Sequence, residues 1–437
     1  MLEKFLTWFI EVSPNLKSAN DLFNQFIEFL EESGYEIIRA NMGTKTLHPQ
    51  VETISYLWVP HTTESMLETQ PDSLSYSRTT HTYKKGLLRE NKFNIGSLTS
   101  TQFSESPIHY VLKTKKDYYF SFENHIGKEF PFPILEELTK YSPTGYLAVP
   151  VVQAGSSFAF LSLLTNKPGG FSLDDQSFLS KALHIISIKW ITFLQTDLTE
   201  SLLNIYLGKS TGSLVQSGKI YRGDLEQINS IIWFSDIRNY SGISEKLIPE
   251  DTIELLNAYF GTVIPIIEKN GGEVLKMLGD GILAVFPYTE NNKKRVGYKA
   301  LLAVREAFAE LMKLNVVRKK LNKHRILHGV GIHLGEIMYG NIGSKDRLDF
   351  TVIGEAVNLT SRIAGMCGEL QKAVLASEEF AKEIAVTWEE IGEHKLKGIA
   401  KPKKIFGIPE VMQASELKKK MKTINRSEKK ERDLESR

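Results

Sequence analysis

The chain has 437 residues, of which 42% are hydrophobic and 24% are charged, a composition that excludes wholesale disorder. This length is enough for two or three domains, each with its own core. The single cysteine, Cys367, excludes an intrachain disulfide and a cysteine-based metal site, and it indicates a reducing compartment; we therefore expect a cytoplasmic protein.

The charge is distributed unevenly along the chain. The net charge is +2, but the last 21 residues hold nine Lys or Arg and four Asp or Glu, so the remainder carries about −3. A slightly acidic body argues against a nucleic-acid-binding protein. We expect a solvated, poorly ordered tail over residues 413–437.

Neither the opening stretch nor the most apolar internal stretch predicts a membrane anchor. The opening stretch, "MLEKFLTWFIEVSPN", is too short and too acidic for a secretory signal. The most apolar stretch elsewhere, "ALHIISIKWITFLQ", is short and is interrupted by Lys189, so it predicts a buried helix and no transmembrane segment.

The first region, residues 1–195, mixes helix and strand. Residues 18–34 place apolar side chains at helical spacing between a serine and a glycine. Residues 145–165 predict two buried strands around a Gly-Ser turn, and residues 171–195 predict a long helix that begins at Ser172. This strand–strand–helix ending resembles an α/β GAF-like sensory or regulatory domain, although the pattern identifies no ligand.

The second region, residues 196–227, predicts a helical connector. Helical periodicity continues to about Tyr206 and then meets Gly and Ser. Such a helix can transmit a signal from one domain to the next, and a plain spacer predicts the same residues.

The third region, residues 228–412, alternates strands with helices and predicts an α+β sheet domain with helices packed on it. The expected elements are a strand that ends at Asp236, a helix over 249–272, a hairpin over 273–286, a helix over 294–315, two strands around a Gly-Glu turn within 327–343, a short helix over 354–370 and a terminal hairpin over 394–408.

Two aspartates in this region predict a metal site. Asp280 lies in "KMLGDG", between two apolar runs, where an Asp-Gly turn would by itself explain it. Asp236 ends an apolar strand, where an unpaired buried carboxylate would cost several kcal/mol. Two carboxylates on adjacent strand ends would repel each other unless a cation lies between them, and Mg²⁺ suits one or two carboxylates together with substrate phosphates. Such a pair of ions assists phosphoryl transfer.

A helix supplies a second pair of polar groups. Asn358 and Arg362 are four residues apart in "VNLTSR", so they share one helical face. An amide and a guanidinium suit a ribose oxygen and an anionic phosphorus centre, whereas an ordinary solvated helix face would also explain them.

Four stretches together resemble the catalytic domain of class III nucleotidyl cyclases. They are "IIWFSDIRNYS", "GGEVLKMLGDGILAVF", "VGIHLGEIMYGNIGSKDRLDFTVIGEAVNLTSRI" and "LKGIAKPKKIFGI", in the order and at the spacing of that family. The resemblance implies a ferredoxin-like sheet core and the conversion of a nucleoside triphosphate to its 3′,5′-cyclic monophosphate and pyrophosphate. It also implies two Mg²⁺ or Mn²⁺ ions per active site and a homodimer with its active sites at the subunit interface.

The resemblance implies a role for nine residues. Asp236, Asp280 and the backbone carbonyl of Ile237 match the metal ligands, and Asn358 and Arg362 match the residues that orient the ribose and stabilise the transition state. Lys276 and Thr351 match the pair that reads the purine, while Arg347 and Lys397 fall near positions that contact the triphosphate.

The sequence departs from the family pattern at a few positions. Asn239 and Tyr240 stand where Gly and Phe are usual, and Glu355 stands where the family has Asp. Thr351 resembles the branch of the family that carries a hydroxyl at that position. None of these departures removes a catalytic group.

The donor pattern of the purine pair predicts ATP as the substrate. Lys276 is donor-only and suits adenine N1, and the Thr351 hydroxyl can accept from the 6-amino group. The leading hypothesis is an adenylyl cyclase governed by its N-terminal domain. A guanylyl cyclase and a catalytically silent cyclase fold that acts as a binding or regulatory partner are the alternatives. A diguanylate cyclase is disfavoured because no Gly-Gly-(Asp/Glu)-Glu-Phe loop is present.

Overall fold

The computed structural model describes residues 1–69, 74–125, 127, 129–152 and 158–408. The chain divides into two compact units, Met1–Leu202 and Leu203–Arg437. The expected Gly-Ser turn after residue 152 and the tail after residue 412 lie outside the described residues.

The N-terminal unit contains a seven-stranded sheet in the order β3-β4-β2-β1-β7-β6-β5. All the pairings between its strands are antiparallel, so this unit is α+β rather than an α/β unit of parallel strands. The strands are β1 (Ile37–Lys45), β2 (Val51–Pro60), β3 (Ser75–Thr82), β4 (Gly86–Asn94), β5 (Tyr118–Ser121), β6 (Gly145–Val152) and β7 (Phe158–Thr165).

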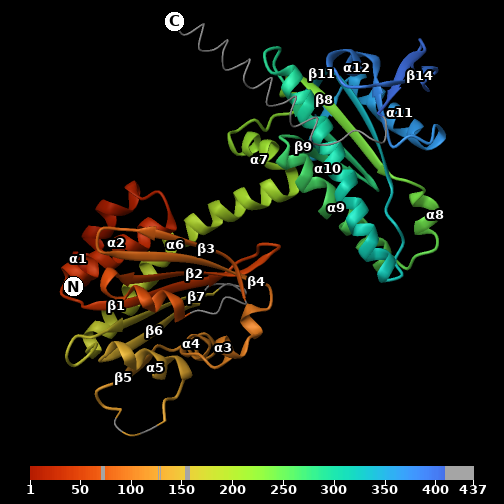
Figure 1. Ribbon diagram of the computed structural model, residues 1–437. Coiled ribbons are helices and arrows are strands. Elements are labelled where there is room, and N and C mark those ends of the chain that lie inside the picture. Colours follow the sequence, from red (N-terminus) through yellow and green to blue (C-terminus); the bar gives the residue numbers. More distant parts are fainter. Residues whose placement is uncertain (70–73, 126, 128, 153–157, 409–437) are drawn as a thin grey trace, which may run out of the picture. The chain divides into compact units, whose positions relative to one another are not determined.

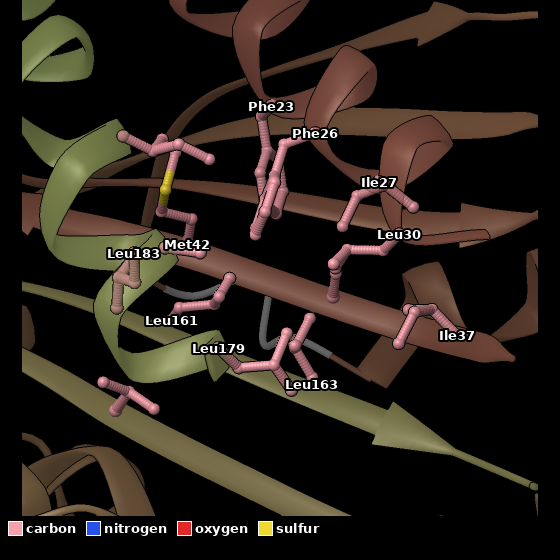
Figure 2. Close-up of a cluster of buried hydrophobic side chains, with 14 of the residues drawn as sticks. Phe23, Phe26, Ile27, Leu30, Ile37, Met42, Leu161, Leu163, Leu179 and Leu183 are labelled. Atoms are coloured by element: carbon pink, nitrogen blue, oxygen red, sulfur yellow. The ribbon is translucent and has the colours of Figure 1, made fainter. Parts of the chain in front are cut away.

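Three helices cover one face of this sheet: α1 (Leu2–Val12), α2 (Ala19–Glu32) and α6 (Leu173–Leu207). The Ser18 hydroxyl accepts a hydrogen bond from the Asp21 N–H at 3.1 Å, which fixes the start of α2. Figure 2 shows the apolar side chains of α2 directed toward β1, β7 and α6. The labelled members of this core are Phe23, Phe26, Ile27, Leu30, Ile37, Met42, Leu161, Leu163, Leu179 and Leu183.

Shorter helices cover the opposite face, where they enclose a second core. They are α3 (Thr101–Ser104), α4 (Pro107–Thr114) and α5 (Pro133–Leu138), with the 3₁₀ turns η2 (His61–Thr69), η3 (Ser97–Thr99) and η4 (Thr139–Tyr141); η1 (Ser13–Asn15) follows α1. The central strands of the sheet are therefore buried on both faces, whereas the edge strand β3 is largely exposed.

Helix α6 begins as the sequence predicts. The Ser172 hydroxyl and the Asp175 carboxylate each accept a hydrogen bond from the other residue's N–H, at 3.1 and 3.0 Å. Among the described helices, α6 alone is long and apolar enough to cross a membrane by length and composition, a test that core helices of soluble proteins also pass. Its N-terminal half supplies buried side chains to the core, including Leu179 and Trp190.

The C-terminal unit contains a mixed sheet in the order β14-β15-β13-β11-β8-β10-β9, with β12 paired to β11. Figure 1 labels strands β8, β9, β11 and β14 of this sheet, together with helices α9, α10 and α11 of the same unit. Its strands are β8 (Leu225–Ile237), β9 (Glu273–Leu278), β10 (Gly281–Pro287), β11 (His328–Gly343), β12 (Leu348–Ile353), β13 (Val374–Ser377), β14 (Glu389–His394) and β15 (Lys403–Gly407). Its helices are α7 (Lys209–Gln216), α8 (Tyr240–Ser244), α9 (Pro249–Lys269), α10 (Lys293–Lys320), α11 (Glu355–Glu369) and α12 (Glu378–Glu383).

The segment β8-α9-β9-β10-α10-β11 forms a ferredoxin-like core. Its four strands lie in the order β11-β8-β10-β9 and are antiparallel to their neighbours, as in a βαββαβ unit. Helices α9 and α10 pack on one face around Trp233, Tyr259 and Phe286. Helix α11 packs on the other face near β13 and β15.

One expectation within this sheet is wrong. Residues 328–343 form a single strand, β11, and not two strands around a Gly-Glu turn. The strand pairs with β8 without interruption through Gly335 and Glu336. Gly335 serves close packing instead, because a Cβ added there would lie 2.7 Å from the Cβ of Ala356 on α11.

Candidate active site at the end of β8

The two predicted aspartates lie side by side at one end of the sheet. Asp236 is the penultimate residue of β8, and Asp280 lies in the two-residue turn between β9 and β10. The Asp280 carboxylate accepts a hydrogen bond from the Ile237 N–H at 3.2 Å. The turn has positive φ at Gly279 and not at Asp280, so its central residues are Gly-Asp and not the expected Asp-Gly.

The local electrostatics favour a cation beside this pair. Burial raises the pKa of Asp236, and the neighbouring Asp280 carboxylate raises it further. Burial also raises the pKa of Asp280, against the hydrogen bond from Ile237. The described residues include no cluster of three or more His, Cys, Asp or Glu that could hold a metal ion. Two carboxylates that repel each other nevertheless fit Mg²⁺, which takes few protein ligands and completes its shell with water and phosphate.

A chain of buried polar groups lies against the end of β8. The indole N–H of Trp233 donates to the Ser235 hydroxyl at 2.9 Å, and that hydroxyl lies 2.9 Å from the hydroxyl of Tyr259. The Tyr259 hydroxyl lies 3.3 Å from Nδ1 of His328. Burial lowers the pKa of His328 to about 3, so the ring is neutral at physiological pH. This chain joins α9 and β11 to the strand that carries Asp236.

Arg238 connects the same strand end to α11. Its guanidinium donates to the backbone carbonyl of Cys367 at 2.6 Å and to that of Lys372. These carbonyls lie at and just beyond the C-terminal end of α11, where a cation also complements the helix dipole. Arg238 therefore holds α11 in place. In the described chain it forms no ion pair with either aspartate, although its charge opposes part of the rise in the pKa of Asp236.

Asn358 and Arg362 project from α11 away from the sheet. Both are exposed, while Leu359 and Ile363 beside them are buried against β13 and β15. In the described part of the chain neither side chain has a hydrogen-bond or ion-pair partner. Their placement on one free helical face matches the prediction, but no contact within the described chain joins them to Asp236 or Asp280.

Lys276 meets a partner that sequence reasoning missed. Its ammonium group forms an ion pair with the carboxylate of Asp349 on β12. Asp349 and Thr351 are two residues apart on that strand and so share one face. The structure thus gathers Lys276, Asp349 and Thr351 into one patch. The signal available in the sequence was the two-residue spacing in "LDFTVIG".

A β-bulge directs Lys276 toward this patch. Leu283 pairs with Lys276 and Ala284 pairs with Val274, so Leu275 is an extra residue on β9. Leu275 packs in the same cluster as Leu283, and the bulge therefore places two consecutive residues, Leu275 and Lys276, on one face of the sheet.

The two residues predicted near the triphosphate lie in exposed segments between strands. Arg347 is exposed in the turn between β11 and β12, where its N–H donates to the Ser344 hydroxyl at 3.1 Å. Lys397 is exposed in the segment between β14 and β15. Asn239 has a φ of 57°, a left-handed conformation that glycine and asparagine adopt with the least strain, so the substitution keeps the turn after β8.

Residues 224–409 match the sequence model of the adenylate and guanylate cyclase catalytic domain. This region contains the aspartate pair, the patch around Lys276 and the exposed face of α11. It belongs to the class III cyclase family. The family match confirms the resemblance inferred from the four motifs, whereas no finding confirms that the N-terminal unit is GAF-like.

Curated relatives match less than half of the chain. The terminal-differentiation-specific adenylate cyclase of Dictyostelium discoideum is 31% identical over 172 residues, which is 39% of this chain and 8% of that protein. An adenylate cyclase of Anabaena cylindrica is 31% identical over 191 residues, 43% of this chain and 36% of that protein. The chain therefore spans well under half the length of these relatives.

Solved structures with a similar cyclase region carry both base specificities in their names. The crystal structure of the guanylyl cyclase Cya2 is 28% identical, covers 43% of this chain and 96% of that chain, and has a TM-score of 0.38. A bacterial light-regulated adenylyl cyclase is 28% identical, covers 45% of this chain and 99% of that chain, and also has a TM-score of 0.38.

Proposed function

We propose that the C-terminal unit is an adenylyl cyclase that converts ATP to 3′,5′-cyclic AMP and pyrophosphate. The observation that carries the proposal is the pair of carboxylates, Asp236 and Asp280, held together at the end of β8 with raised pKa values. No cation among the described residues pairs with them. An exogenous cation is the simplest way to relieve their repulsion.

Different residues of the chain would have different roles in the attack of the ribose 3′ oxygen on the α-phosphorus. Asp236, Asp280 and the Ile237 carbonyl would hold two Mg²⁺ or Mn²⁺ ions, which when bound neutralise charge on the attacking and leaving oxygens. Asn358 would orient the ribose so that its 3′ oxygen faces the α-phosphorus in line with the departing pyrophosphate. Arg362 would stabilise the charge that develops there, since its guanidinium is permanently charged and has no partner among the described residues.

The homodimer forms part of the proposal, because Asn358 and Arg362 lie on a face of α11 that makes no contact with Asp236 or Asp280 in the described chain. Each active site would combine the aspartates of one subunit with the purine and α11 groups of the other. Mixing inactive Asp236→Ala with inactive Arg362→Ala should then restore activity at one of the two sites. Absence of restored activity in subunits shown to exchange would argue for a site within one chain.

The patch around Lys276 supports ATP over GTP. Lys276 can donate to adenine N1 but would face a donor at guanine N1, and the Thr351 hydroxyl can accept from the adenine amino group. Lys276 is partly exposed, and a guanine base covering it would place a donor against a donor and remove its contact with solvent, so discrimination should be strong.

The decisive experiment is turnover of the purified full-length chain with ATP or GTP, each with Mg²⁺ or Mn²⁺. At equal substrate concentrations, we expect more cyclic AMP to form from ATP than cyclic GMP from GTP. The double change Lys276→Glu with Thr351→Cys should lower ATP turnover and raise the ratio of GTP to ATP use. A wild-type chain that prefers GTP would make it a guanylyl cyclase, and one that turns over neither nucleotide would leave a silent cyclase fold.

We further propose that the N-terminal unit regulates the cyclase. Helix α6 crosses the boundary between the two units without interruption, which gives a continuous element through which the N-terminal unit can act. Removing residues 1–195 should change basal turnover severalfold. Equal kinetic constants for the full-length and shortened chains at equal dimer fractions would reduce the N-terminal unit to a passive attachment.

A further inference from the structure

A cavity of about 180 Å³ lies in the N-terminal unit, on the face of the sheet opposite α1, α2 and α6. Strands β1, β2, β6 and β7 form its floor, and the segment from η3 to α4 contributes to its wall. Much of its lining is apolar, including Phe93, Phe103, Ile108, Ile134 and Phe160. A cavity that combines apolar walls with a few polar groups is the usual form of a small-molecule site.

One charged side chain, Arg39 of β1, lines this cavity, and it is only 6% exposed. Its Nε atom is buried without a hydrogen-bond partner, and in the described part of the chain no carboxylate forms an ion pair with its guanidinium. Burial lowers the pKa of Arg39, and the acid that opposes this effect, Glu137, is exposed and acts more weakly than two tyrosines. A buried guanidinium with no partner is costly, and proteins rarely keep one without a use.

Two further polar groups in the cavity also lack partners. The side-chain oxygen of Asn41, two residues beyond Arg39, is buried and unbonded, and so is the hydroxyl of Ser55 on β2. Asn41 is 8% exposed and Ser55 is 5% exposed, so bulk solvent does not satisfy them. Three unpartnered polar side chains around one cavity indicate that a bound molecule completes their hydrogen bonds.

A β-bulge explains how a charged residue enters this face. Ile37 pairs with Thr165 and Arg39 pairs with Leu164, so Ile38 is an extra residue on β1. Ile38 packs in the core on the cavity side, and Arg39, its neighbour in sequence, lines the cavity on that same side. In a regular strand consecutive side chains point to opposite faces, and bulges of this kind re-aim side chains near functional sites.

We propose that this cavity binds a small organic carboxylate that has an apolar body and a single negative charge. The Arg39 guanidinium would hold the carboxylate through paired N–H donors, a geometry that suits carboxylates well. The apolar walls would hold the body of the molecule. A single charge is indicated because Arg39 is the one charged residue in the described lining, so a phosphate dianion would remain partly uncompensated.

Calorimetric titration of the full-length chain with benzoate tests the proposal, with neutral benzamide as the matched probe. Benzoate should bind saturably, and benzamide should bind at least about tenfold more weakly, as expected for loss of a buried charge-assisted hydrogen bond. Arg39→Met should weaken benzoate binding by a similar factor. Arg78→Met, which removes one positive charge from β3 outside the cavity, should leave binding unchanged.

The unliganded proteins provide a second, independent readout. Arg39→Met removes an unpaired buried charge and keeps an unbranched apolar stem, so the melting temperature without ligand should stay the same or rise. A fall in melting temperature would contradict the inference that the guanidinium has no partner. Arg39→Lys should fold, keep the charge and still lose affinity, because an ammonium lacks the planar fork.

Several results would overturn the proposal. One is the absence of saturable binding by acetate, butyrate, benzoate and phenylacetate at millimolar concentration. Another is equal binding of benzoate and benzamide, or equal benzoate binding by the wild-type chain and Arg39→Met. A third is tighter binding of inorganic phosphate than of every carboxylate, with the same dependence on Arg39. That result would show that the cavity binds phosphates and not carboxylates.

Discussion

Arg39 in the N-terminal unit and Lys276 in the C-terminal unit are presented in the same way but reach different surroundings. Each is a basic residue that follows the extra residue of a β-bulge, which turns it onto the same face as its apolar neighbour, Ile38 or Leu275. Lys276 finds Asp349 within the chain, whereas Arg39 is buried and has no partner in the described residues.

The contrast between Lys276 and Arg39 shows which kind of site can be predicted from a sequence. Lys276 lies within a motif that also contains Asp280, so its role could be predicted from the family resemblance. Arg39 stands in a buried strand of mixed composition, and only the packing around it shows that its charge is unpaired among the described residues. If this contrast holds, substitutions of charged residues in the C-terminal unit should change turnover, whereas Arg39 substitutions in the N-terminal unit should change ligand binding.

The largest expected effect is loss of cyclase activity when either metal aspartate is removed. Asp236→Ala or Asp280→Ala should lower turnover by about a thousandfold or more, since a bound metal supplies several kcal/mol to the transition state. Benzoate binding by the N-terminal unit should be unchanged, which provides the matched control. Substantial turnover by either variant would remove the two-aspartate site from the proposal.

The two aspartate variants should also differ in stability. Asp236→Ala relieves a buried repulsion, so without metal the C-terminal unit should unfold at an equal or higher temperature. Asp280→Ala relieves the same repulsion but leaves the Ile237 N–H without its acceptor, so its gain should be smaller. Thermal unfolding in the presence of a chelator measures both.

A smaller effect is expected from the Lys276 partner. Asp349→Asn removes the charge that holds Lys276 beside Thr351, so the KM for ATP should rise by about threefold to tenfold while the fold is retained. Glu393→Gln, an exposed carboxylate on β14 outside this patch, is the matched control. An unchanged KM and an unchanged ratio of ATP to GTP use would show that Lys276 needs no such partner.

Acid should destabilise the C-terminal unit first. Burial lowers the pKa of His333 to about 4 and that of His328 to about 3, so below pH 6.5 the unfolded chain binds protons that the folded chain does not. Stability is therefore fully present above pH 6.5 and falls as pH falls toward 4, by roughly 3 kcal/mol at most for His333. The raised pKa values of Asp236 and Asp280 act in the opposite direction and offset part of this loss.

The N-terminal unit should lose stability at a lower pH. Hydrogen bonds to Glu52 and Asp175 outweigh burial and lower both carboxyl pKa values, so their contribution is present above the ordinary carboxyl pKa and is lost below it. His48 is an exception in this unit, because burial lowers its pKa and its loss therefore begins below pH 6.5, as for the two C-terminal histidines. The two units can be followed separately because the single cysteine, Cys367, is buried in the C-terminal unit. The chain is exposed to urea at each pH, and the thiol is then labelled at one constant pH, so the extent of labelling reports unfolding of the C-terminal unit. His333→Gln should flatten its pH dependence.

The smallest effect concerns a helix start. Ser18→Ala removes the hydroxyl that caps α2 and should lower the stability of the N-terminal unit by about 1 kcal/mol. Protection of Cys367 and turnover should not change, because α2 packs within the N-terminal core. Ser18→Asp should restore the stability, since aspartate also caps well. A parallel loss of Cys367 protection would show that the two units unfold together.

Local patterns in the sequence determined the elements whose residues act locally. The serine caps of α2 and α6, the hairpin of β9 and β10, and the helical face shared by Asn358 and Arg362 all follow from side-chain chemistry within a few residues. The ferredoxin-like core and the nearness of Asp236 and Asp280 followed from the family motifs and are confirmed by the strand order and the hydrogen bond at Ile237.

Tertiary packing decided the rest. Gly335 signals a turn in isolation, but β11 continues through it because β8 supplies backbone partners from His328 to Gly340 and α11 packs too closely for a side chain there. Asp349 became a candidate only when β12 brought it to Lys276. The cost of burying Arg39 depends on groups from several separate strands and helices, so no local pattern could have revealed it.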